Sequence, residues 1–144
     1  MSAETLSEGM GRDSSLRAVA EGAMSHAYAP YSNFRVGAAV KSGDGRVFAG
    51  ANVENASYGL GMCAERAAIA TAVTAGARTF DALALVSDSD GPVSPCGACR
   101  QVLAEFAPDL RIISYGLNGE IAEWTVAELL PHQFRLNQGN ETSK

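Results

Sequence analysis

The order of apolar and polar residues in the first third of the chain predicts one helix followed by two strands. Apolar side chains recur at the spacing of one helix face at Leu16, Val19, Ala20, Ala23 and Ala27. Ser14 or Ser15 is placed to cap that helix. A strand with one buried face is predicted where apolar residues take every second position, at Phe34, Val36, Ala38 and Val40. The run Gly43-Asp44-Gly45 predicts a hairpin turn into a second strand over residues 46–52.

The rest of the chain predicts further strands that alternate with helices. An Ala-rich helix extends from Cys63 to a C-cap at Gly76, and Pro95 opens another helix. Thr125 and Glu128, three residues apart, form a capping box for a last short helix. Short apolar runs and a turn at 118–119 predict strands over residues 80–86, 110–115 and 120–124.

This order of elements, α-β-β-α-β-α-β-β-α, predicts the α/β class. A mixed central β-sheet covered by helices on both faces gives a three-layer α/β/α sandwich. The length of 144 residues is that of one domain, so a single domain over residues 1–144 is expected. Residues 1–13 and 137–144 are largely polar and are expected to fray.

Composition and charge exclude several classes of function. Hydrophobic residues make up 47% and charged residues 19%, which is typical of a globular protein. The net charge of −5 argues against nucleic acid as a partner, because phosphate binding needs a basic surface. The longest run without Asp, Glu, Lys or Arg is the 13 residues 22–34, too short for a membrane span. With no visible secretory signal, we expect a cytoplasmic protein.

Three cysteines carry the first candidate chemistry. Cys96 and Cys99 are three residues apart at a helix start, so both sulfurs can face one point, and Cys63 begins another helix. A helix N-terminus stabilises the thiolate form that binds metals. Three thiolates without an obvious fourth protein ligand match an open zinc site with water in the remaining position. The two histidines, His26 and His132, have no ligand-like neighbours.

Glu65 is the candidate proton carrier beside this metal. It lies two residues after Cys63, roughly 200° further around a helix, so it flanks the metal without needing to bind it. A carboxylate there can take a proton from the bound water and deliver it to a substrate. Two other classes stay open: a binding module with a structural zinc, which needs a fourth ligand, and a redox protein, which uses Cys96 and Cys99 alone.

Several segments together resemble the small homotetrameric, zinc-dependent cytidine deaminases. The resemblance extends over residues 16–136 and includes Cys-x-Glu followed, 30 residues later, by Pro-Cys-x-x-Cys. The segments that carry it are residues 31–39 (YSNFRVGAA), 52–60 (NVENASYGL), 63–66 (CAER), 95–101 (PCGACRQ) and 128–131 (ELLP), the last followed by Phe134.

The resemblance implies roles for residues around the metal. The positions that match Asn52 and Glu54 hold the ribose hydroxyls in that family, a task that suits an amide and a carboxylate. Phe34 matches the aromatic residue that packs on the pyrimidine, and Ala64 matches a backbone donor to the base. Arg66 matches a guanidinium that donates to the thiolates and offsets their negative charge.

The resemblance also implies that neighbouring subunits complete each pocket. Phe134 matches the residue that reaches a neighbour's pocket, and Tyr58 and the backbone at Ala56 match further inter-subunit elements. The expected partners are therefore a small nucleoside and other copies of the chain in a homotetramer, with one Zn²⁺ per chain. Neither a nucleic acid nor a membrane is expected as a partner.

The function implied by the resemblance is hydrolytic deamination of cytidine and 2′-deoxycytidine to uridine and 2′-deoxyuridine, with release of ammonia, in pyrimidine salvage. Zinc-bound hydroxide attacks C4 of cytosine, and Glu65 shuttles the protons. The alternative is a deaminase of a modified cytosine nucleoside such as blasticidin S. A polynucleotide deaminase is disfavoured, because the chain is acidic and has no basic segment interleaved with aromatic residues.

Overall fold

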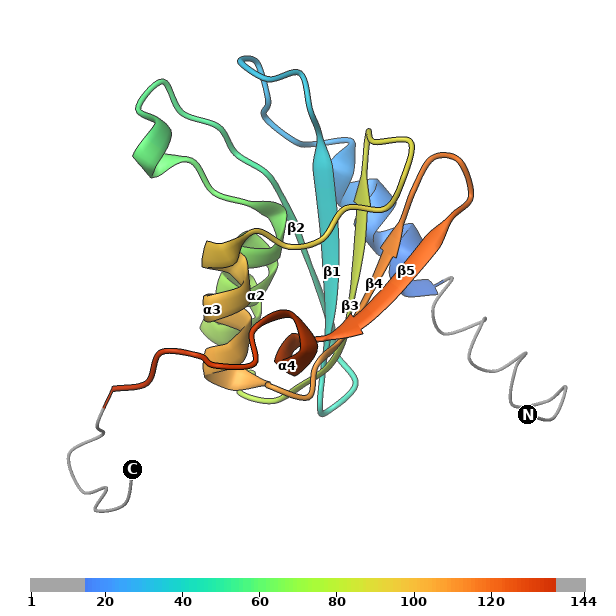
Figure 1. Ribbon diagram of the computed structural model, residues 1–144. Helices are drawn as coiled ribbons and strands as arrows, with labels where there is room; N and C mark the ends of the chain where they lie inside the picture. Colours follow the sequence, from blue (N-terminus) through green and yellow to red (C-terminus); the bar gives the residue numbers. More distant parts are fainter. Residues whose placement is uncertain (1–14, 137–144) are drawn as a thin grey trace, which may run out of the picture.

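A five-stranded sheet forms the centre of the computed structural model, which describes residues 15–136 (Figure 1). The strands are β1 Val36–Ser42, β2 Val47–Ala51, β3 Phe80–Ser87, β4 Arg111–Tyr115 and β5 Ile121–Thr125. The helices are α2 Ala64–Thr74, α3 Gly97–Phe106 and α4 Val126–Leu129, with the short 3-10 helix η1 Tyr58–Leu60. Residues 15–24 are also helical and precede β1.

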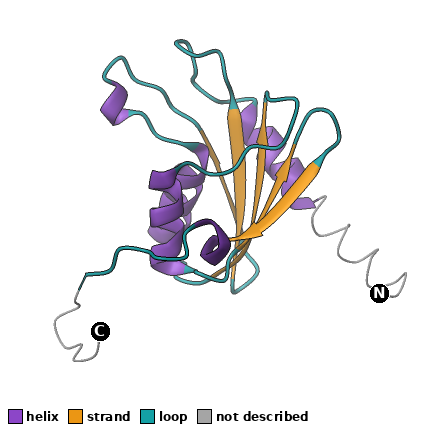
Figure 2. Ribbon diagram, viewed as in Figure 1, coloured by secondary structure: helices purple, strands orange, loops and turns teal. Residues whose placement is uncertain are grey.

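The sheet is mixed and is covered on both faces. Its strand order is β2-β1-β3-β4-β5, in which β3 and β4 run parallel and the other neighbours run antiparallel. The helix over residues 15–24 packs on one face, and α2, α3 and α4 pack on the other (Figure 2). These three layers confirm the predicted α/β/α class.

β1 is buried on both faces, which corrects the prediction of a single buried face. Ala38 and Val40 lie in the cluster formed with α2 and α3. Ala39 points to the opposite face and is also fully buried, in a cluster with Leu16 and Ala20 of the first helix. Because β1 lies inside the sheet with a helix on each side, the residues between its predicted core positions are covered as well.

Two glycines let the helices rest directly on the strands. A Cβ on Gly50 of β2 would overlap the backbone of α2, with the Ala64 carbonyl oxygen only 2.6 Å away. A Cβ on Gly37 of β1 would overlap the first helix on the other face, where the Met24 nitrogen lies 2.7 Å away. The layer spacing therefore depends on the absence of a side chain at these positions.

One edge of the sheet collects the segments that carry the candidate chemistry. β1 begins at this edge, and β2 and β3, both antiparallel to β1, end there. The chain then enters α2 and α3 from the same edge, the upper one in Figure 1, so their N-termini lie beside each other. Cys63 and Cys96 are the N-cap residues of these two helices.

The ends of some elements differ from their predicted positions. The capping box of Thr125 and Glu128 is present and confirmed. The first helix stops before Ala27, and Phe34 lies outside β1 because a side chain, described below, engages the backbone at this point. Ser14 and the ends expected to fray, residues 1–13 and 137–144, lie outside the described residues. Within residues 15–136, no helix has both the length and the apolar character to cross a membrane.

We predict that Gly50→Ala lowers the free energy of unfolding by about 1–3 kcal/mol, because the new methyl group pushes α2 away from β2. Gly22→Ala is the matched control, since a Cβ at Gly22 meets nothing within 4 Å. In a helix that change raises stability by about 0.5–1 kcal/mol. Urea unfolding of both variants tests the pair, and equal stability of the two would contradict the close packing of α2 on β2.

Candidate metal centre and active site

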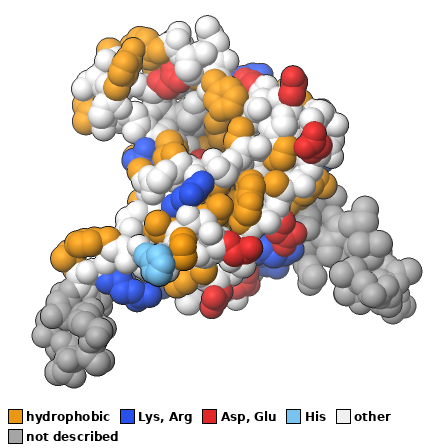
Figure 3. All heavy atoms as spheres, viewed as in Figure 1, with side chains coloured by type: hydrophobic (Ala, Val, Ile, Leu, Met, Phe, Trp, Pro, Cys, Tyr) orange, Lys and Arg blue, Asp and Glu red, His pale blue; other side chains and the backbone are white. Residues whose placement is uncertain are grey.

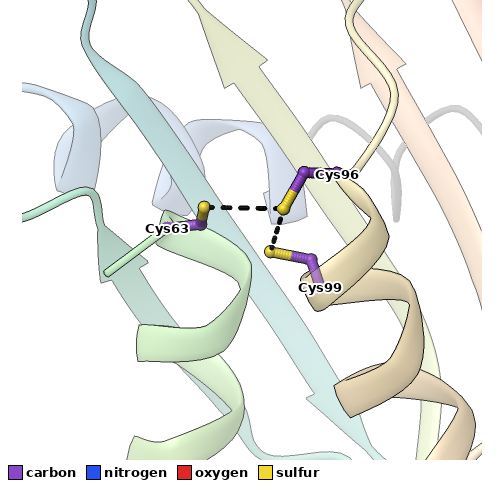
Figure 4. Close-up of side chains that lie close together, drawn as sticks. All are labelled: Cys63, Cys96 and Cys99. Atoms are coloured by element: carbon purple, nitrogen blue, oxygen red, sulfur yellow. Dashed lines mark hydrogen bonds between the residues drawn. The ribbon is translucent and has the colours of Figure 1, made fainter. Parts of the chain in front are cut away.

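Three cysteine sulfurs meet where the N-termini of α2 and α3 come together (Figure 4). Cys63 caps α2, Cys96 caps α3, and Cys99 lies in the first turn of α3. The sulfurs of Cys63 and Cys96 are 3.8 Å apart, and those of Cys96 and Cys99 are 3.5 Å apart. All three lie within 4.8 Å of one another.

This spacing fits one zinc ion. Tetrahedral zinc with Zn–S bonds of about 2.3 Å holds its sulfurs about 3.8 Å apart. No fourth His, Cys, Asp or Glu of residues 15–136 joins the group, so a bound zinc would keep one position for a non-protein ligand. A structural zinc site is disfavoured, because it would need a fourth protein ligand among these residues. A redox pair of Cys96 and Cys99 is also disfavoured, because it does not explain why the Cys63 sulfur lies beside them.

The surroundings of the Cys63 sulfur favour its thiolate form, whereas the hydrogen bond to Cys63 and burial raise the pKa of Cys99. The first N–H groups of each helix have no intrahelical partner and carry partial positive charge. Hydrogen bonds from the Cys99 thiol and from Arg66 lower the pKa of Cys63 to about 5. The Arg66 Nη2 lies 3.5 Å from the Cys63 sulfur, and this contact raises the pKa of Arg66 above its ordinary value. Arg66 is thus positioned to offset thiolate charge.

Glu65 follows the first thiol but has a different environment. It is the second residue of α2, and only 5% of its surface is exposed. Burial, with a smaller contribution from the Cys63 thiolate, raises the pKa of Glu65 to about 7, while a backbone hydrogen bond, Cys99 and Arg66 oppose the shift. A carboxyl with a pKa near neutrality can accept and release a proton at physiological pH. Glu65 is not a member of the sulfur group, as expected for a proton carrier.

A cavity of about 460 Å³ lies beside the thiols, and its volume suits a small organic ligand. The loops before β1 and after β2 line one side, and the starts of α2 and α3 line the other. The predicted site residues on its walls are Phe34, Asn52, Glu54, Tyr58, Cys63, Ala64, Glu65, Arg66 and Cys96. The fold therefore brings most of the predicted site residues to one place.

Asn52, just after β2, shapes this cavity by holding the backbone before β1. Its side-chain oxygen accepts from the Val36 N–H at 2.9 Å, and its nitrogen donates to the Phe34 carbonyl at 2.9 Å. These two bonds keep the chain at Phe34 from joining the sheet. The Phe34 ring belongs to the cavity wall, not to the core that its apolar alternation would suggest.

Glu54 holds the same loop at Tyr31 and Ser32, just before Phe34 in the chain. One carboxylate oxygen accepts from the backbone N–H groups of Tyr31 and Ser32, at 2.9 and 3.1 Å. The other accepts from the Ser32 hydroxyl. These bonds, the hydroxyl first among them, lower the pKa of Glu54 below its usual value. Glu54 therefore faces the cavity as a carboxylate.

Two of the predicted substrate residues, Ala56 and Phe134, do not line the cavity. Phe134 is 66% exposed, and its backbone exchanges two hydrogen bonds, of 3.0 and 3.3 Å, with the Gln101 side chain of α3. Tyr58 borders the cavity but is 86% exposed. Hydrophobic side chains, including Tyr58 and Leu60, gather on the projecting loop that carries η1 (Figure 3). The resemblance assigns Ala56, Tyr58 and Phe134 to pockets shared between subunits.

Other residues of the site carried no sequence signal of their own. The cavity walls that prediction missed include Ser32, Val93 and Ser94. Arg100 fixes the entry to α3, because it donates to the Pro95 carbonyl at 2.8 Å, the Leu129 carbonyl at 3.0 Å and the Ser94 hydroxyl at 3.3 Å. Ser32 and Arg100 lie inside segments that carried the resemblance, which was the one available pointer to them.

Comparison with known proteins defines the family. The cytidine and deoxycytidylate deaminase zinc-binding region matches residues 10–115. A cytidine deaminase from Sporosarcina psychrophila is 52% identical over 113 residues, covering 78% of this chain and 83% of that protein. The crystal structure of cytidine deaminase from Burkholderia pseudomallei superposes with a TM-score of 0.81 at 49% identity, covering 83% of this chain and 97% of that one. The chain therefore belongs to the cytidine and deoxycytidylate deaminase family, whose zinc-binding region includes the three thiols.

A blasticidin-S deaminase from Bacillus cereus is a more distant relative. It is 34% identical over 110 residues, which cover 71% of this chain and 78% of that protein. This identity is well below the 52% shared with the cytidine deaminase above.

We predict that Cys63→Ser, Cys96→Ser and Cys99→Ser each weaken zinc binding, by more than the ~10–100-fold that loss of an outer hydrogen bond causes. Ser25→Ala is the control, because the Ser25 hydroxyl is exposed and bonds to the Gly22 carbonyl, outside the cavity beside the thiols. Metal analysis after dialysis against graded chelator measures the effect. Retention of zinc at the parent level by any one Cys variant would contradict a site made of three thiols. A parent protein without metal, in which Cys96 and Cys99 oxidise reversibly, would instead support the hypothesis of a redox protein.

Proposed function

We propose that the chain deaminates cytidine and 2′-deoxycytidine by hydrolysis, giving uridine or 2′-deoxyuridine and ammonia, in pyrimidine salvage. One observation carries this proposal: the buried carboxyl of Glu65 lines the same cavity as Cys63 and Cys96, two of the three clustered thiols. Family membership and the high identity to cytidine deaminases support the substrate.

In this proposal Cys63, Cys96 and Cys99 hold the zinc, which when bound supplies a water acidic enough to attack a ring carbon at neutral pH. Glu65 accepts one proton of the attacking water and delivers it to N3 of the cytosine; it then takes the remaining proton from the hydroxyl formed on C4 and delivers it to the leaving amine. Its pKa of about 7 supports both directions of transfer. Arg66 stabilises the Cys63 thiolate through the contact at 3.5 Å.

The remaining cavity residues orient the nucleoside. Phe34 packs on the pyrimidine, and the Ala64 N–H, in the first turn of α2 and without an intrahelical partner, donates to the base. Asn52 and Glu54 bind the sugar hydroxyls. Asn52 keeps one donor and one acceptor site beyond its bonds to the backbone, which supports this role.

We further propose that the working unit is a homotetramer in the cytoplasm. The exposure of Tyr58 and Phe134, and the position of Phe134 and Ala56 outside their own cavity, support pockets completed by neighbouring chains. A reducing compartment suits the site, because its metal ligands must remain free thiols.

We predict that Glu65→Gln reduces the rate of uridine and ammonia release by about 10²–10⁴-fold, because the variant cannot carry the proton. Zinc content stays at one per chain, since Glu65 is not a ligand. Glu105→Gln, an exposed carboxylate on α3, is the control and retains full activity.

Steady-state assays of both variants, with metal analysis, make the test. Full activity of Glu65→Gln would refute the proton role. A zinc-loaded parent that ignores cytidine but turns over blasticidin S would move the substrate to a modified cytosine nucleoside.

We predict that Glu65→Gln and Phe134→Ala chains, each impaired alone, regain activity when they assemble together. A chain with intact Glu65 would then receive Phe134 from its neighbour. Sedimentation velocity should give about four times the chain mass of 15.0 kDa. Differently tagged chains, unfolded and refolded together, provide the mixed assemblies. An active monomer, or mixtures no more active than their components, would show that each pocket is self-contained.

A further inference from the structure

The Ser32 hydroxyl joins two residues that face the cavity. It donates to one carboxylate oxygen of Glu54 and accepts from the Phe34 N–H at 3.0 Å. Ser32 lines the cavity and is exposed, so its hydrogen bonds are not needed to pair polar groups buried in the core. A side chain that uses both its donor and an acceptor site at the mouth of a cavity fixes the geometry there.

The carboxylate of Glu54 is nearly saturated by these contacts. An ionised carboxylate has about four acceptor sites, two on each oxygen. The N–H groups of Tyr31 and Ser32 take both sites on one oxygen, and the Ser32 hydroxyl takes one on the other. One acceptor site remains, and the hydroxyl bond determines its direction.

We propose that Ser32 is a positioning residue for sugar recognition: its hydroxyl orients Glu54 so that the last free acceptor site meets a sugar hydroxyl of the nucleoside. This inference rests on the proposed function. It goes beyond that function by making the preference for hydroxylated sugars depend on a residue that need not touch the sugar.

Loss of the Ser32 hydroxyl should leave the base end of the cavity in place. The backbone at Phe34 is held independently, because Asn52 bonds to the Phe34 carbonyl and to the Val36 N–H. The thiols and Glu65 lie on α2 and α3 and make none of the Ser32 contacts. The defect should therefore appear in the binding of the sugar and not in the chemical step.

The test compares two ligands in the parent and three variants. Ser32→Ala should raise the KM for cytidine by about tenfold, the size expected for one hydrogen bond to a charged group, with kcat within about twofold. Its inhibition constant for 2′,3′-dideoxycytidine, which lacks both ring hydroxyls, should change by less than about twofold. Ser32→Thr, which keeps the hydroxyl, should restore the KM for cytidine.

Ser25→Ala is the matched control, because the Ser25 hydroxyl is exposed and bonds to the Gly22 carbonyl at 2.6 Å, outside the cavity. It should match the parent with both ligands. Equal losses for cytidine and 2′,3′-dideoxycytidine in Ser32→Ala, or no loss for either, would overturn the positioning role. Absence of cytidine turnover in the parent would overturn the proposed function itself, and this inference with it.

Discussion

The approach of two helix N-termini at one edge of the sheet is the constraint on which the site depends. Cys63 and Cys96 are both N-caps, so the distance between their sulfurs, 3.8 Å, is set by how α2 and α3 lie on the strands. The bare backbone at Gly50 lets α2 reach that position. The metal centre is thus a consequence of helix packing, and the local charge of the helix ends then stabilises the thiolates.

Glu65 shows how the same packing serves two chemical needs. It lies within two residues of a thiol, yet its carboxyl is buried and titrates near neutrality, while the Cys63 thiol is shifted toward the ionised form. The two side chains leave the start of α2 in different directions, and the Cys63 thiol is partly exposed whereas the Glu65 carboxyl is buried. The N-cap and first turn of α2 therefore hold a candidate metal ligand and a candidate proton carrier at fixed relative positions.

The thiols and Glu65 could be predicted from the sequence, because helix geometry over a few residues determines where their side chains lie. A thiol at a helix start, and a carboxylate two residues later, follow from helix geometry, and the family resemblance gave the rest. The loop before β1 could not be predicted in this way. Apolar alternation extended the strand through Phe34, whereas the Asn52 side chain, 18 residues away, diverts the backbone there. The two hydrogen bonds of the Ser32 hydroxyl could not be predicted either. A serine in a sequence gives no sign of whether its hydroxyl finds partners in the fold.

The two loops of the cavity are bonded mainly to each other. Val53 pairs through its backbone with Tyr28 on one side and with Met62 on the other. The hydrogen bonds between Glu54 and Ser32 connect the two loops a second time. None of the three cysteines takes part in these bridges, and Met62 directly precedes Cys63 at the start of α2. Substitutions in the loop before β1 can therefore reshape that side of the cavity, while the positions of the three sulfurs stay set by α2 and α3.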